Sequence, residues 1–183
     1  MIPIAVHKEG VLEKASEIAG RLGKVARTKF DTSDKSPGYK FAEAEMRGIP
    51  VRVEIGPKDI EAGRAVLVRR DTREKIFVSL DNVEQEIADL LVKIHDDMYQ
   101  RALENTQAKT HVARSHEEFL DIAKNHPGFI KAMWCGDQAC EDRIKEEFAA
   151  TSRYIPFKEE HIADTCVCCG KPAKHMVYWG KQY

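Results

Sequence analysis

The sequence predicts an α/β protein in two parts, a larger layered domain followed by a smaller domain organised around cysteines. Segments with the alternation of strands and segments with helical periodicity follow one another over about residues 1–104. This order is typical of a sheet with helices packed on it. Beyond that stretch, four of the cysteines form two short pairs separated by a long spacer. A chain of 183 residues is long enough for one large domain or two small ones.

The first part opens with a short apolar run, residues 2–6, which we expect to be a strand. Residues 9–22 repeat apolar side chains at helical spacing, and Gly23 ends that helix. Residues 24–30 can form a second strand, and a polar loop rich in turn-forming residues follows them. The next segment, residues 39–47, has the pattern of a short helix.

Residues 51–55 alternate between apolar and charged side chains, which places Arg52 and Glu54 on the sheet face opposite the core. A turn at Pro57 follows, then a hairpin of two strands, and a long helix that begins near residue 81.

In the second part, residues 105–114 are polar without a clear period, which makes them the best candidate for a linker between domains 1–104 and 105–183. A capping box at Ser115 starts a helix. The remaining expected elements are strands at 129–134, 151–157 and 174–179 and a helix at 141–150.

The cysteine pairs are Cys135 with Cys140 and Cys166 with Cys169, separated by 25 residues. Each pair bends the chain so that two thiolates face one point, and the spacer lets the two bends converge. Four thiolates with no vacant position predict a structural zinc site rather than a catalytic one. The fifth, Cys168, fits the spacing less well, and we expect it to point away from the metal; Cys168, His161 and His175 remain alternative ligands.

Two other uses of the cysteines are weaker hypotheses. A redox C-x-x-C would leave Cys135 and Cys140 without a role. Secretory disulfides are disfavoured because five cysteines leave one unpaired and no signal peptide is recognisable.

Charge is distributed unevenly although the net charge is −1. Residues 1–80 carry 16 Lys/Arg against 12 Asp/Glu, whereas residues 81–183 carry 13 against 18, so the first part is the place to look for an anionic partner. Basic groups can hold phosphates, whereas carboxylates can accept hydrogen bonds from guanine. A surface that carries both charges therefore suits the binding of an unpaired base. An ordinary solvated face is the alternative. The residues concerned are Lys35, Lys40, Arg52, Glu54, Lys58, Asp59, Arg64, Arg69 and Arg70.

Catalytic motifs are not recognisable in the sequence. It contains no P-loop, no G-x-S-x-G and no dinucleotide fingerprint, and its seven histidines are scattered. No apolar run approaches the roughly 20 residues needed to span a bilayer, so we expect no membrane association.

Several collinear segments resemble the prolyl-tRNA synthetases of the archaeal/eukaryotic-type branch, which also occurs in some bacteria. Ser36-Pro-Gly-Tyr-Lys-Phe41, Gly48-Ile-Pro50, Arg52-Val-Glu-Ile-Gly-Pro-Lys-Asp59 and Val66-Leu-Val-Arg-Arg-Asp71 are similar to the anticodon-binding domain of that family. The cysteine pairs, the Cys169-Gly-Lys-Pro-Ala173 segment and the final Tyr183 are similar to its zinc-containing C-terminal domain. The resemblance covers nearly the whole chain.

The resemblance implies a mixed five-stranded sheet flanked by helices, the class IIa anticodon-binding fold, followed by a small zinc-bound α/β domain. It also implies recognition of tRNA(Pro), whose anticodons share guanines at their second and third positions. The ATP, Mg²⁺ and proline sites would lie in a class II catalytic core missing from this chain, in a cytoplasmic, homodimeric proline–tRNA ligase. Glu54 is the first choice for the guanine contact, with Asp59 as the alternative. Lys40, Arg52, Lys58, Arg69 and Arg70 would contact the RNA around it.

In that family the terminal tyrosine is directed towards the catalytic domain, and the resemblance implies the same for Tyr183. Tyr39, Ala44 and Cys168 depart from the family pattern. Because Met1 opens directly into a strand, we expect a piece of a longer enzyme. A free-standing zinc-stabilised module that binds protein or RNA is the alternative.

Overall fold

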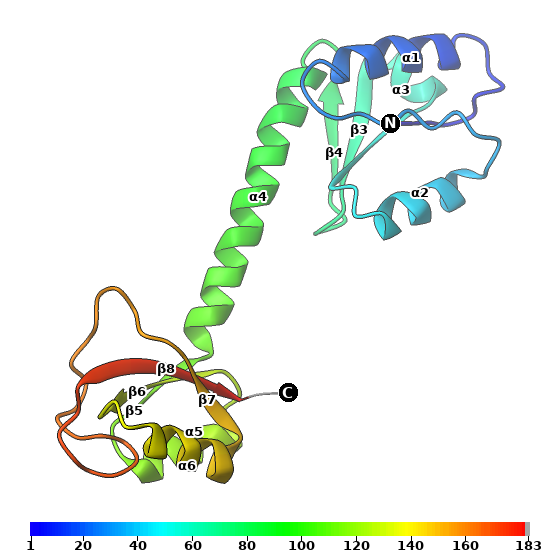
Figure 1. The fold of residues 1–183 in the computed structure, drawn as a ribbon. Helices are drawn as coiled ribbons and strands as arrows, with labels where there is room; N and C mark the ends of the chain where they lie inside the picture. The colour runs from blue at the N-terminus through cyan, green and yellow to red at the C-terminus, as the bar shows by residue number, and fades with distance from the viewer. Residues whose placement is uncertain (182–183) are drawn as a thin grey trace. The chain divides into compact units, whose positions relative to one another are not determined.

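The computed structural model describes residues 1–181, which form two compact units divided between Tyr99 and Gln100. Each unit is a four-stranded sheet with helices packed against it (Figure 1). The α/β class predicted from the sequence is confirmed. No helix among residues 1–181 is long and apolar enough to cross a membrane.

The first unit contains a mixed sheet in the order β1-β2-β3-β4. β1 pairs parallel with β2, and the pairs β2–β3 and β3–β4 are antiparallel. The elements of this unit are β1 (Ile2–Pro3), α1 (Val11–Leu22), α2 (Pro37–Met46), β2 (Val51–Ile55), α3 (Pro57–Glu61), β3 (Arg64–Arg69), β4 (Lys75–Ser79) and α4 (Val83–Ala108), whose end continues into the second unit.

The two faces of this sheet have different cover. Val53 and Ile55 of β2 pack with Ile18 of α1 and with Ile87 and Ile94 of α4, so these helices bury the core face. On the other face, Arg52 of β2 lies against α2. The alternation in β2 predicted this division between the faces, whereas the covering of the second face by α2 was not predicted.

Two sequence expectations for this unit are wrong. The sheet has four strands among the described residues rather than five, and residues 24–30 form no strand. This segment runs beside β1, but two isolated hydrogen bonds replace a ladder: the Met1 amino group donates to Lys29 O at 2.8 Å, and Asp31 N–H donates to Met1 O at 3.0 Å.

The second unit has the strand order β5-β6-β8-β7. Its elements are β5 (Thr110–Ala113), α5 (His116–Asn125), β6 (Phe129–Trp134), α6 (Gln138–Phe148), β7 (Ala150–Tyr154) and β8 (His175–Lys181). α5 and α6 lie together on one face of this sheet (Figure 1). The core includes Phe119 of α5, Ile144 of α6 and Trp179 of β8.

The segment 105–114, expected to be a linker, is ordered secondary structure. Its first residues complete α4, and Thr110–Ala113 pair parallel with β6 as an edge strand. The capping box at Ser115 is half confirmed. Ser115 Oγ accepts from Glu118 N–H at 3.1 Å, but the Glu118 carboxylate accepts from Arg114 N–H, one residue before the expected donor.

Candidate metal centre and candidate RNA-binding surface

Four cysteines converge at one end of the second unit. Cys135 follows β6 directly, and Cys140 lies in the first turn of α6, after a turn in which Gly136 has φ +84°. Cys166 and Cys169 lie in a tight turn before β8, in which Gly170 N–H donates to Cys166 O at 3.0 Å and Gly170 has φ +70°. Glycine adopts these positive φ values without steric cost.

The sulfur positions fit a tetrahedral metal. All four Sγ atoms lie within 4.8 Å of one another, with 3.6 Å between Cys135 and Cys140 and 3.8 Å between Cys135 and Cys169. Zinc–sulfur bonds of about 2.3 Å in a tetrahedron place sulfurs about 3.8 Å apart. A disulfide needs about 2.05 Å, and all five cysteines are free thiols. The donor set could therefore hold a metal ion, and the four cysteines that the sequence singled out are the ones that converge.

The surroundings of individual thiols in this group shift their pKa values in different directions. Burial is the main cause for two of them. Burial raises the pKa of Cys140 strongly, and it also raises the pKa of Cys135. A hydrogen bond from the backbone of Lys171 lowers the pKa of Cys169 to about 7. Buried thiols crowded together cannot all ionise alone, whereas a divalent cation at their centre would stabilise them as thiolates.

The fifth cysteine, Cys168, lies beside this group but is not among the four whose sulfurs converge. Its side chain is half-buried, and burial raises its pKa. His161 and His175, the other alternative ligands, instead face Asp164 at 2.7 Å and Glu159 at 3.5 Å respectively.

In the first unit, a charged cluster gathers around Arg52 on the second sheet face. The guanidinium carbon of Arg52 lies 4.1 Å from the ring centre of Phe41 on α2. Arg52 Nε donates to Glu54 at 2.8 Å, and Nη1 donates to Glu45 at 3.1 Å. Glu45 keeps 42% of its side chain exposed, whereas Glu54 keeps 12%, so Glu45 is the accessible carboxylate.

Phe41 and Glu45 were not among the residues singled out from the sequence. The strand alternation identified Arg52 and Glu54, but it carries no information about which helix lies over them. The spacing of Phe41 and Glu45, one helical turn apart, was the available signal that both occupy one face of α2.

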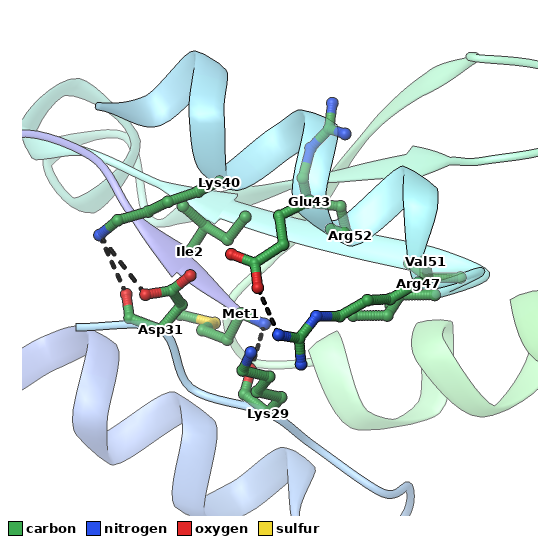
Figure 2. A pocket seen from close by; sticks show the side chains of 11 residues that line it. Met1, Ile2, Lys29, Asp31, Lys40, Glu43, Arg47, Val51 and Arg52 are labelled. Atoms are coloured by element: carbon green, nitrogen blue, oxygen red, sulfur yellow. Dashed lines mark hydrogen bonds and ion pairs between the residues drawn. The ribbon is translucent and has the colours of Figure 1, made fainter. Parts of the chain in front are cut away.

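Lys40 is not a surface residue. Its side chain is 3% exposed, and Nζ donates to Asp31 O at 3.2 Å and lies 3.8 Å from the Asp31 carboxylate (Figure 2). The cavity beside it measures about 30 Å³, which is enough for roughly one water and not for a small-molecule ligand. Lys40 therefore joins α2 to the chain after residue 30.

Arg69 is also buried. Its guanidinium, 3% exposed, donates to Asp71 at 3.0 and 2.8 Å and to Asp97 of α4 at 2.9 Å. These carboxylates raise the pKa of Arg69, and Arg69 in turn lowers the pKa of Asp97. Arg69 therefore links the end of β3 to the long helix α4.

The other predicted contacts lie nearer the surface. Lys58, Arg70 and Lys35 are exposed. Asp59 accepts from Gly56 N–H at 3.1 Å at the start of α3 and faces Arg64 at 3.5 Å, so it has a capping role in the fold. Tyr183 lies outside the described residues.

Comparison with known proteins agrees with this division into two units. Residues 1–90 match the family model of the anticodon binding domain, and residues 116–183 match that of the prolyl-tRNA synthetase C-terminal domain. By sequence, the chain is similar to prolyl-tRNA synthetases, and its second unit matches their C-terminal domain.

Relatives in this family match along the whole chain. Proline–tRNA ligases from Lachnoclostridium phytofermentans, Clostridium botulinum (strain 657 / Type Ba4) and Clostridium novyi (strain NT) are 62%, 60% and 58% identical over all 183 residues. The chain spans 38% of the length of each of these relatives.

Proposed function

We propose that this chain is the C-terminal part of a proline–tRNA ligase and recognises the anticodon of tRNA(Pro). The observation that carries the proposal is the cluster of Arg52 with Phe41, Glu45 and Glu54 in the unit that matches the anticodon binding domain. We assign anticodon recognition to residues 1–104 and the metal-binding domain to residues 105–183.

The cluster has the chemistry of a guanine site. On its Watson–Crick edge guanine offers a ring N–H and an amino group beside the O6 acceptor. Glu45, as the accessible carboxylate, would accept from the two donors, and Arg52 would donate to O6. Glu54 holds Arg52 from within the sheet, and Phe41 supplies an aromatic surface next to it. Glu54 thus becomes a positioning residue, with Glu45 as the base contact.

The remaining residues would act around this site. Lys58 and Arg70 are exposed cations that would contact phosphates, and Asp59 would order the turn that presents Lys58. Lys40 and Arg69 would act indirectly, by fixing α2 and the end of β3.

For the second unit we propose a structural Zn²⁺ held by Cys135, Cys140, Cys166 and Cys169. When bound, the metal would supply cross-links between β6, α6 and the turn before β8, with no open position for a reacting group. Tyr183 would be directed towards the catalytic domain, which would supply the ATP, Mg²⁺ and proline sites of a homodimeric cytoplasmic enzyme.

The test is binding of tRNA(Pro), and of versions in which each shared anticodon guanine is replaced by adenine. Each replacement should weaken binding by about 1–3 kcal/mol, because a paired contact is lost. Glu45→Gln should narrow the difference between native and altered tRNA, whereas Arg70→Ala should weaken both similarly. The matched control is Arg143→Ala, an exposed arginine of α6. Equal binding of native and altered tRNA would refute the proposal.

A further inference from the structure

Phe77 is an exposed aromatic residue in the middle of an edge strand. It lies on β4, and 58% of it is accessible to solvent. The guanidinium carbon of Arg64, on the neighbouring strand β3, lies 4.5 Å from the centre of its ring. Asp59 faces Arg64 at 3.5 Å, which holds the arginine beside the ring. One side of the ring is therefore covered by a cation, while much of the residue remains open.

The strand register places Phe77 on the same face as the Arg52 cluster. Glu54 pairs with Val66, and Val66 pairs with Phe77, so the three residues form one row across β2, β3 and β4. Neighbouring strands are 4.7–4.9 Å apart, which puts Phe77 about 10 Å from Glu54 along the row. In sheets that bind single-stranded RNA, aromatic residues on adjacent strands stack successive bases.

On the strands of this face, cations outnumber carboxylates. Among the residues of β2, β3 and β4, those that share the face of Phe77 include three cations, Arg52, Arg64 and Lys75, and one carboxylate, Glu54. Lys75 is exposed and lies two positions before Phe77 on the same strand. An exposed aromatic ring with a guanidinium over one side fits a nucleotide, with its flat base and its phosphate, better than an apolar protein surface.

We propose that Phe77, together with Arg64, is a stacking platform for an unpaired nucleotide next to the guanine held at Arg52. Arg64 would contact the adjacent phosphate while Phe77 stacks on the base. The inference rests on the proposed function, because it extends the same RNA path from β2 to the edge strand β4.

The test uses the whole 183-residue chain and an RNA hairpin whose loop carries a proline anticodon. Phe77→Ala should weaken binding about tenfold, because stacking of one base is lost. Phe77→Trp should bind as well as the unaltered chain, because the indole can also stack. Phe157→Ala is the matched control, since Phe157 is a fully exposed phenylalanine in the second unit. It should bind as the unaltered chain does.

A fluorescent base locates the nucleotide. With 2-aminopurine placed in turn at each loop position, the unaltered chain should change the fluorescence most strongly at one position next to the guanines. Phe77→Ala should abolish that change and leave far-UV circular dichroism unaltered. Unchanged affinity of Phe77→Ala, or an equal loss in Phe77→Trp, would overturn the stacking platform. If the unaltered chain does not distinguish guanine from adenine, the proposed function itself fails.

Discussion

The proposed metal centre makes a sharp prediction about Cys166. This residue is 3% exposed, and its sulfur is one of the four that converge. Replacing it with serine removes one of the four sulfurs that converge. Cys168→Ser is the matched control, because Cys168 lies in the same turn but outside the group of four.

The expected magnitude follows from the size of the second unit. A domain of about 80 residues is stable by roughly 4–12 kcal/mol in total. A structural zinc ion contributes about 10–16 kcal/mol of binding free energy to folding. The metal term is therefore as large as the whole stability of the unit, so Cys166→Ser should leave residues 100–183 largely unfolded. Residues 1–99 should remain folded, because their core forms a separate cluster.

The chain offers a selective assay. Its two tryptophans, Trp134 and Trp179, both lie in the second unit, so their fluorescence follows that unit alone. Trp179 is fully buried and packs edge-on against Trp134 at 6.4 Å between ring centres, so unfolding should shift the emission to longer wavelength. Elemental analysis should find one zinc in the unaltered chain and in Cys168→Ser.

Two results would refute this reasoning. One is a Cys166→Ser protein that keeps stoichiometric zinc and the tryptophan emission of the folded state. The other is loss of zinc on Cys168→Ser, which would show that Cys168 is a ligand and that the assignment of ligands in this turn is wrong. A chelator should reproduce the effect of Cys166→Ser in the unaltered chain and have no further effect in the variant.

Three further predictions concern stability. Arg69→Ala should lower the free energy of unfolding of the first unit by about 3–5 kcal/mol, because it removes the buried guanidinium that bonds both Asp71 and Asp97. Asp97→Asn, at a site 37% exposed, should cost about 1 kcal/mol or less, and urea denaturation followed by circular dichroism measures both. The hydrogen bond from Arg21 lowers the pKa of Glu84 below its ordinary value, so this pair stabilises the fold above the unfolded-state pKa and the stabilisation is lost as pH falls through the folded-state pKa. Glu84→Gln should remove that part of the acid dependence of the unfolding free energy. Gly128→Ala should destabilise the second unit by about 2 kcal/mol or more, because the added Cβ would clash with the backbone carbonyl oxygen of Lys109. An unchanged tryptophan-detected melting temperature would contradict this.

Local pattern in the sequence predicted much of the framework. The strands Val51–Ile55 and Phe129–Trp134 have the bounds expected from alternation and from the position before Cys135. The four cysteines whose spacing predicted a common site are the four whose sulfurs converge. One short turn is enough to bring the two members of each pair together. These features depend on residues that are close together along the chain, so they can be recognised from one sequence.

Only the tertiary structure decided which charged residues are buried. Lys40 and Arg69 carry charges that are usually solvated, and a buried charge is stable only beside a partner. The partner of Arg69 on α4 is 28 residues away in sequence, and no local pattern shows that pairing. Likewise, Thr110–Ala113 is polar enough to be taken for a linker, and it becomes a strand because a parallel neighbour satisfies its backbone. Non-local pairing, which the sequence does not display, therefore determined which of the predicted contact residues remain exposed.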